Sequence, residues 1–357
     1  MQIGKNFYGI LEDDVNTIIN HNLPWEVLSG CKILVTGGSG FIGSYFIRTL
    51  LALHRLNKVS KPVKVIALVR DIESAYKQFK DLLNYRDLSF VQWDLNSIAT
   101  PKIDNVNYII HAGSNASPRY YGSDPVGTLL PNSVGTAALL DILFHSDEPK
   151  GFLFISSGEV YGDIKSDIKL NESCYGVVDP STVRACYSES KRMGETMCIA
   201  WHHQYKLPTF IARSFHTYGP GLSSQDGRAF ADFVFNVVRN ENIIMNSDGA
   251  VRRAFCYVSD AIAGFFTILL KGNIAQPYNV GNSNGELSIL ELAELLVALY
   301  PEKNLLIERK NNSQNGYIPS EFLHLIPDVT KLNALGWNAK IEPVIGFRRM
   351  IEAYKYE

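Results

Sequence analysis

The stretch Thr36-Gly37-Gly38-Ser39-Gly40-Phe41-Ile42-Gly43 decides the fold of this chain. It follows the apolar run Ile33 to Val35, and it opens a segment, Phe41 to Leu53, whose apolar residues recur with helical spacing. Glycines between a strand and a helix allow a tight turn and let the backbone approach a pyrophosphate, which the helix N-terminus favours. A glycine run alone is a weak signal, but this context predicts dinucleotide binding. The residues expected at the cofactor are Gly37, Gly40, Phe41, Ile42 and Gly43.

Six further apolar runs alternate with helix-like stretches, as the strands of a buried parallel sheet do. They lie at residues 63–69, 89–93, 106–110, 152–155, 209–212 and 277–280. The pattern predicts an α/β fold, a Rossmann-type doubly wound parallel sheet with a smaller C-terminal substrate-binding lobe. We expect an N-terminal arm over 1–30, the dinucleotide-binding domain with its catalytic helix over 31–219, and the lobe mainly over 220–357. Within the arm, a short helix is expected from Asp13 to Asn20, and Trp25 is expected to pack on the main body. Parts of 250–282 complete the first domain.

Composition excludes several classes of protein. The 357 residues are 46% hydrophobic with a formal net charge of -2, which argues against disorder and gives no footprint for nucleic acid. No run reaches the roughly 18 apolar residues of a membrane span, so we expect no membrane partner. The five cysteines are scattered without a C-x-x-C pair and the histidines lack metal-ligand spacing, so we expect no metal and a reduced, cytoplasmic setting.

The second strand ends Ala67-Leu68-Val69-Arg70-Asp71. An acid that binds the adenosine ribose of NAD is expected at the end of this strand, where Val69 stands. Arg70 could instead pair with a 2′-phosphate, which favours NADP, although Asp71 could still reach the ribose. NAD and NADP therefore both stay open. Asp94 and Leu95, at the end of the third strand, are expected against the adenine.

Four residues predict the chemistry. Tyr187 and Lys191 are four apart and so share a helix face, where the ammonium would lower the pKa of the phenol and make it a base. Ser157, at the end of the fifth strand, could bond the hydroxyl that Tyr187 deprotonates. Glu159, two residues further on, could act as base, acid or orienting group.

These motifs, together with His111-Ala112-Gly113-Ser114, resemble those of extended short-chain dehydrogenase/reductases. The chain is most similar to the nucleotide-sugar branch and, within it, to UDP-glucuronate decarboxylases, from about Lys32 to its end. The matching text includes Ser114-Asn115-Ala116-Ser117-Pro118, Ser157-Gly158-Glu159-Val160-Tyr161-Gly162, Arg184-Ala185-Cys186-Tyr187, Asp226-Gly227-Arg228 and Arg253-Ala254-Phe255.

The resemblance implies a redox-neutral cycle on a nucleotide-diphosphate sugar. The sugar is oxidised at C4 with tightly bound NAD or NADP and then decarboxylated at C5. The residues implied at the cofactor also include Ala112, Gly113, Tyr187 and Lys191, and those implied at the substrate are Ser117, Glu159, His216, Arg228 and Arg253. The family also implies a homodimer.

Departures from the family leave alternatives open. The decarboxylases carry Thr at Ser157, Ser at Gly158 and Asn at His216. The dTDP-glucose 4,6-dehydratases carry an Asp where Gly158 stands, whereas GDP-mannose 4,6-dehydratases use the Glu alone, so a 4,6-dehydratase is the first alternative. A 4-epimerase is the second, although simple epimerases generally lack the Glu. An alternative of another class is a cofactor-binding regulator that has lost catalysis.

Overall fold

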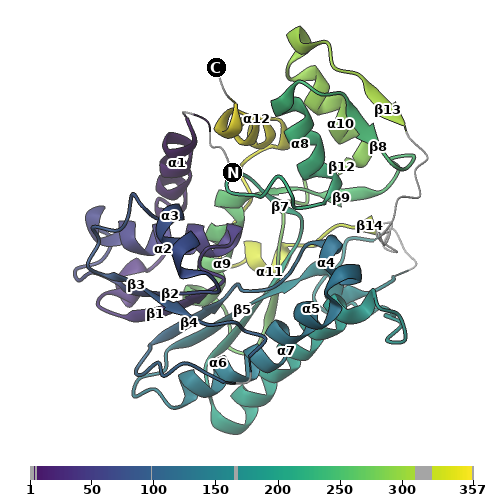
Figure 1. Cartoon of the computed structure of the whole chain (residues 1–357). Helices are drawn as coiled ribbons and strands as arrows, with labels where there is room; N and C mark the ends of the chain where they lie inside the picture. Colours follow the sequence, from purple (N-terminus) through teal and green to yellow (C-terminus); the bar gives the residue numbers. More distant parts are fainter. Residues whose placement is uncertain (1–3, 5, 98, 165–167, 310–323, 356–357) are drawn as a thin grey trace.

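A seven-stranded parallel sheet forms the centre of the molecule (Figure 1). The computed structural model describes residues 4, 6–97, 99–164, 168–309 and 324–355. The strand order is β11-β6-β5-β4-β1-β2-β3. The strands are β1 (Lys32–Thr36), β2 (Lys64–Val69), β3 (Leu88–Gln92), β4 (Tyr108–His111), β5 (Gly151–Ser157), β6 (Thr209–Ser214) and β11 (Pro277–Val280). All seven coincide with the expected apolar runs, so the predicted Rossmann-type fold is confirmed.

Helices cover both faces of the sheet because alternate residues of each strand point to opposite sides. Ile33 and Val35 of β1 pack into one apolar cluster, and Leu34 packs into another. The first cluster takes side chains of α2 (Phe41–Arg55) and α9 (Val258–Lys271). The second takes those of α6 (Val134–Phe144) and α7 (Ala185–Tyr205), which Figure 1 shows below the sheet. The remaining helices near this sheet are α3 (Ile72–Gln78), α4 (Pro118–Ser123), α5 (Pro125–Asn132) and the short η2 (Gly158–Tyr161).

The N-terminal segment packs as a helix and a short turn. The helix predicted from Asp13 to Asn20 already begins at Phe7, and α1 (Phe7–Ile19) lies against α2, α9 and α12 (Pro343–Tyr354). In η1 (Trp25–Leu28), the buried indole of Trp25 meets the ring of Phe266 edge-on, with centroids 5.0 Å apart. The arm therefore packs against α2 and α9, two helices beside the sheet. Trp25 packs on the main body, as expected.

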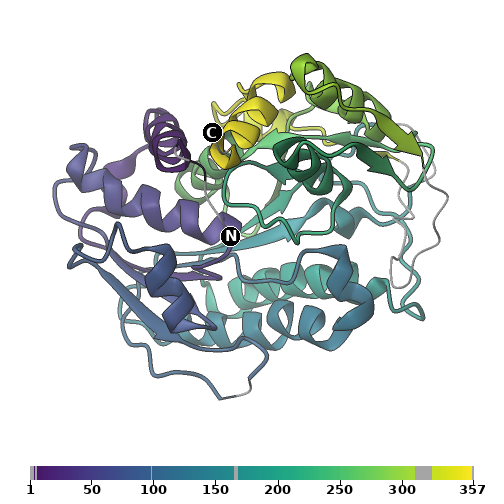
Figure 2. The same cartoon turned by 45° about the horizontal axis from the view of Figure 1, so that its top comes forward.

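A second group of elements lies beside the carboxyl ends of the strands (Figure 2). It contains small sheets in the orders β12-β9-β14, β13-β8 and β10-β7. Its strands are β7 (Thr217–Tyr218), β8 (Ile243–Met245), β9 (Arg252–Ala254), β10 (Cys256–Tyr257), β12 (Glu286–Ser288), β13 (Ile307–Arg309) and β14 (His324–Leu325). Its helices are α8 (Ala229–Arg239), α10 (Ile289–Ala298), η3 (Pro301–Lys303), α11 (Thr330–Asn333) and α12. The chain returns to the main sheet through α9 and β11, so the two parts share one continuous core.

One stretch among the described residues, Pro125–Phe144, is long and apolar enough to cross a membrane by length and composition. The expectation that no such run exists was based on uninterrupted apolar residues, whereas this stretch includes Asn132 and Ser133. In the structure it forms α5 and α6, and half of the window is buried. The amide of Asn132 donates to the Ser190 hydroxyl of α7 at 3.1 Å, so polar groups tie this pair of helices to the fold.

Candidate functional site

A cavity of about 1300 Å³ separates the carboxyl edge of the sheet from the second group of elements. Open parallel sheets bind ligands at this edge. Every residue expected at the cofactor or substrate lines the cavity except Gly43. These residues are Gly37, Gly40, Phe41, Ile42, Arg70, Asp94, Leu95, Ala112, Gly113, Ser117, Ser157, Glu159, Tyr187, Lys191, His216, Arg228 and Arg253.

The glycine turn at one end of the cavity leaves no space for side chains. Gly37 has a φ of +62°, and a Cβ on it would lie 2.7 Å from the Gly113 Cα. A Cβ on Gly43 would lie 2.1 Å from the Gly37 carbonyl oxygen, so Gly43 supports the turn from behind and does not face the cavity. The backbone and the start of α2 are thus open to an anion, which fits the pyrophosphate of a dinucleotide.

A buried histidine joins the ends of β1 and β4. The Gly113 N–H donates to the Thr36 hydroxyl at 3.0 Å, and the Thr36 Oγ1 lies 2.8 Å from the His111 Nδ1. Burial and the charge of Lys191 lower the pKa of His111 to about 3, so the ring is neutral. Because the Pro131 carbonyl can only accept, the neutral ring carries its proton on Nε2, 3.1 Å from that oxygen, and Nδ1 accepts the Thr36 hydroxyl. This chain of bonds fixes the cavity wall beneath the glycine turn.

At the end of β2, Val69 stands where a carboxylate that binds the ribose was expected. Val69 is buried, whereas the Arg70 side chain is exposed and lines the cavity. The Asp71 carboxylate accepts the Ser74 N–H at 3.1 Å and thereby caps α3. Asp94 accepts the Asn96 N–H at 3.0 Å. The cation at position 70 is therefore available to a ligand, while Asp71 already has a structural role.

Ser157, Tyr187 and Lys191 meet at the centre of the cavity, and all three are buried. The Ser157 side chain lies close enough to Tyr187 to favour the ionised phenol, and the Lys191 Nζ lies 5.8 Å from the centroid of the Tyr187 ring. The sequence predicted a lowered pKa for Tyr187, but burial and the charge of Glu159 raise it to about 12. Burial also lowers the pKa of Lys191 to about 7, and it outweighs the attraction of the Glu195 carboxylate for the Lys191 ammonium.

Glu159 lies beside this triad and is held by a residue that sequence reasoning did not single out. The Arg184 guanidinium forms an ion pair with the Glu159 carboxylate at 2.8 Å. Arg184 also covers the Tyr121 ring at 4.6 Å, and that ring stacks on Tyr187 with centroids 5.1 Å apart. Its position in the sequence could have indicated it. Arg184 precedes Tyr187 by three residues, so both side chains face the same side of the helix start.

Two arginines line the opposite end of the cavity. The Arg228 guanidinium is oriented by Asp226, with Nη2 at 2.9 Å from Oδ2, and it lies over the Phe230 ring at 4.9 Å. Arg253 is buried on β9 and its Nη1 donates to the Arg252 carbonyl at 2.8 Å. Two cations that line the same cavity suit a diphosphate.

His216 and Ser117 also belong to this end of the cavity. Burial and the charges of Arg253 and Arg228 lower the pKa of His216 well below its usual value, so its ring is neutral. The Ser117 hydroxyl donates to the Asp226 carbonyl, so it joins two walls of the cavity as well as lining it.

Residues 33–281 match the model of the NAD dependent epimerase/dehydratase family. The chain belongs to this family. A UDP-glucuronic acid decarboxylase 6 from Arabidopsis thaliana is 32% identical over 328 residues, which cover 92% of this chain and 90% of the relative. This similarity confirms the resemblance to the nucleotide-sugar branch of the extended short-chain dehydrogenase/reductases.

Solved structures of the family share the fold of this member. A dTDP-glucose 4,6-dehydratase from Streptomyces venezuelae, with NAD and TYD bound, has a TM-score of 0.76 and 24% identity. The match covers 90% of this chain and 96% of that one. A UDP-glucuronic acid 4-epimerase from Bacillus cereus, in complex with UDP-glucuronic acid and NAD, has a TM-score of 0.74 and 22% identity, covering 90% and 98%. The family and the glycine turn together identify an NAD(P)-binding site in this member.

Proposed function

We propose that this protein oxidises the sugar of UDP-glucuronate at C4 and then decarboxylates it at C5. The observation that carries the proposal is the grouping of Ser157, Tyr187, Lys191 and Glu159 in one cavity that extends from the glycine turn to Arg228 and Arg253. Relatives named UDP-glucuronic acid decarboxylases, which align over 92% of the chain, support the same choice of substrate.

The first step requires a base at the C4 hydroxyl. When bound, NAD(P) accepts a hydride from C4, returns it after decarboxylation and adds a positive charge to the site. The Tyr187 oxygen takes the hydroxyl proton, and the Ser157 Oγ shares the same hydrogen bond. The Lys191 ammonium stabilises the phenolate, which counteracts the effect of burial on Tyr187. Gly37, Gly40 and Gly113 would hold the dinucleotide by their backbone.

The second step breaks the bond between C5 and C6. The electron pair of this bond passes into the C4 ketone as an enolate, and the C6 carboxylate leaves as CO₂. C5 then takes a proton. Glu159, oriented by Arg184 at 2.8 Å, lies in the cavity where it can direct that proton transfer. Arg253 would attract the substrate carboxylate or the diphosphate.

Gly158 separates decarboxylation from the more common form of dehydration. A Cβ at this position would lie 2.9 Å from the Phe215 ring, which leaves no room for an Asp that would protonate a leaving C6 hydroxyl. A dehydratase that uses Glu159 alone remains the second candidate, because Glu159 and Tyr187 line the same cavity. The presence of Glu159 disfavours a simple 4-epimerase.

The cofactor proposed for this site is NADP rather than NAD. Arg70 is exposed at the end of β2, where a 2′-phosphate would lie, and Val69 offers no carboxylate to a ribose hydroxyl. Asp71 already accepts the Ser74 N–H as the cap of α3, which competes with that role.

The chain is also proposed to form a homodimer. Large apolar side chains are exposed on α5 and α7, among them Val126 at 65%, Leu129 at 40% and Met193 at 50%. A second copy would remove these side chains from water. Light scattering measures the mass directly, and a monomer at micromolar concentration would contradict this part of the proposal.

The deciding experiment incubates the purified protein with UDP-glucuronate and either NADP⁺ or NAD⁺, followed by mass spectrometry of the sugar nucleotide. Loss of CO₂ supports the proposal. Dehydration of dTDP-glucose or GDP-mannose without decarboxylation of UDP-glucuronate would replace it by the dehydratase. Tyr187→Phe is the control and should abolish turnover. If no nucleotide sugar changes the absorbance of the bound cofactor, the protein is the inactive cofactor-binding regulator.

A further inference from the structure

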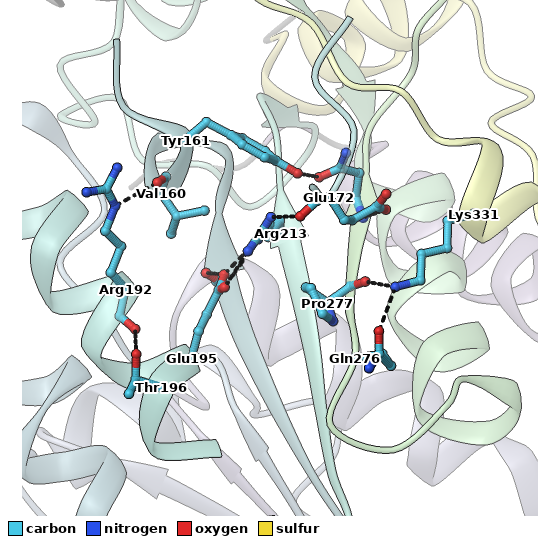
Figure 3. A network of polar contacts seen from close by, with 12 residues as sticks. Val160, Tyr161, Glu172, Arg192, Glu195, Thr196, Arg213, Gln276, Pro277 and Lys331 are labelled. Carbon is cyan, nitrogen blue, oxygen red and sulfur yellow. Dashed lines mark hydrogen bonds and ion pairs between the residues drawn. The ribbon is translucent and has the colours of Figure 1, made fainter. Parts of the chain in front are cut away.

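A second polar cluster joins α7 to β6 (Figure 3). Glu195 of α7 and Arg213 of β6 point toward one another and form a buried ion pair, with 2.7 Å between Nη2 and Oε2 and 3.0 Å between Nε and Oε1. The Arg213 guanidinium also covers the Tyr161 ring at 4.8 Å and donates to the Glu172 carbonyl at 3.2 Å. On its outer side the pair borders a second cavity of about 950 Å³. Neither residue lines the cavity that holds Tyr187.

Two side chains of α7 are anchored on consecutive residues of β5. The Lys191 ammonium donates to the Ile155 carbonyl at 2.6 Å, and the Glu195 carboxylate accepts the Ser156 hydroxyl at 2.5 Å. Ser156 is also the register partner of Arg213 across the sheet. The next residue of β5 is Ser157, which contacts Tyr187. The Glu195 carboxylate therefore lies at the junction of α7, β5 and β6 that determines how Lys191 and Ser157 meet Tyr187.

The charges around Lys191 leave Glu195 as its main anionic neighbour. On α7, Lys191 shares a helix face with Tyr187 and with Glu195, which is one turn further on. His111 on β4 is neutral and β5 presents the Ile155 carbonyl. Glu159 on η2 is paired with Arg184, and Asn132 on α5 is uncharged. Arg213 on β6 is paired with Glu195 itself. The carboxylate of Glu195 thus opposes the desolvation of the Lys191 ammonium.

We propose that Glu195 is a positioning residue, whose carboxylate, held by Ser156 and Arg213, anchors α7 on β5 and stabilises the ammonium of Lys191 that Tyr187 needs to act as a base. This inference rests on the proposed function for the role of Tyr187. It adds that a charge outside the substrate cavity determines the pH range of the reaction.

The test compares the wild type with Glu195→Gln and with the double variant Glu195→Gln/Arg213→Met. The single variant leaves the Arg213 cation unpaired, whereas the double variant removes both charges. In each variant the Lys191 ammonium is less stable. The alkaline limb of the pH profile of kcat/KM should therefore move to lower pH. We expect a shift of about one pH unit in the double variant and a larger shift in the single variant. Glu189→Gln, which breaks the outer ion pair of Glu189 with Arg192 on the same helix, is the matched control and should leave the limb unchanged.

A substrate-free measurement separates this inference from the proposed function. The tyrosinate absorbance of the wild type minus that of Tyr187→Phe reports the ionisation of Tyr187 with cofactor bound. In the double variant this titration should move to higher pH, even if UDP-glucuronate proves not to be the substrate. Glu195→Asp keeps the charge and should retain the wild-type titration. The proposal would be overturned if a folded double variant kept both the wild-type titration and the wild-type alkaline limb of kcat/KM. It would also be overturned if Glu195→Asp shifted them as much as the neutral variants do.

Discussion

Glu159–Arg184 and Asp14–Arg349 are two ion pairs with the same contact distance and different surroundings. Each joins a carboxylate to a guanidinium at 2.8 Å. The first lines the substrate cavity, with the Glu159 side chain 17% exposed. The second joins α1 to α12, with the Asp14 side chain 1% exposed. The difference between them lies in what else each carboxylate binds.

Asp14 is enclosed by its protein partners. Its carboxylate also accepts the hydroxyls of Tyr257 at 2.9 Å and Tyr45 at 3.1 Å. Glu159 accepts only a long bond from Ser188 at 3.3 Å besides its ion pair among the contacts described, and it faces the cavity. A fully bonded buried pair holds elements together, whereas a pair with one open side can take part in chemistry. The comparison predicts that changes at the first pair affect turnover and changes at the second affect stability.

The largest effect is expected from Glu159→Gln. The amide keeps the shape of the side chain but cannot exchange a proton, so turnover of UDP-glucuronate should fall about 10³-fold. Oxidation at C4 does not need Glu159, so reduced cofactor should accumulate and can be followed by its absorbance. Asp14→Asn is the matched control and should leave turnover unchanged. Equal losses in the two variants would remove the distinction between the pairs.

The second effect concerns the pH dependence of stability through Asp14. Burial raises the pKa of Asp14 from 3.8 to about 6, so the folded protein binds this proton more tightly than the unfolded chain does. The stability from this group is complete below about pH 4 and is lost as the pH rises through 6, by at most about 3 kcal/mol. Urea unfolding of the wild type should therefore show a decline between these pH values that Asp14→Asn lacks. Parallel curves for the two proteins would contradict the assignment.

A smaller effect is expected from Arg184→Met. The change removes the cation that orients Glu159, and turnover should fall about tenfold while the fold is retained. The equivalent change in the other pair, Arg349→Met, should lower the free energy of unfolding because it leaves Asp14 buried without its cation. Thermal unfolding and turnover measured on both variants compare the pairs directly. Loss of stability in Arg184→Met with normal turnover of the folded fraction would reverse the comparison.

The smallest effect is expected from Arg70→Ala, far from both pairs. The exposed guanidinium would form a solvent-screened contact with a 2′-phosphate, so its loss should weaken NADP binding up to about fivefold and leave NAD binding unchanged. Isothermal titration with each cofactor measures both dissociation constants. An equal change for the two cofactors would show that Arg70 does not select between them.

Local patterns in the sequence predicted the sheet and much of the candidate site. A parallel strand buried on both faces is a continuous apolar run, and the seven runs marked β1 to β6 and β11 within a residue or two. Ser157, Tyr187 and Lys191 were found because a strand end and a helix spacing of four are local signals. Arg184 was missed, because its partner Glu159 lies on a different element. The start of α1 at Phe7 was missed because Asn6 makes no side-chain cap.

The sequence by itself determined the order of strands and helices, the glycine turn and the family, since each depends on residues close together in the chain. Only the tertiary structure decided the charges of the site. Tyr187 has a raised pKa and Lys191 a lowered one because burial removes both from water, and no spacing rule contains that burial. Tertiary structure also decided that Glu159 pairs with Arg184 and Glu195 with Arg213. Their partners converge only when β5, β6 and α7 pack together.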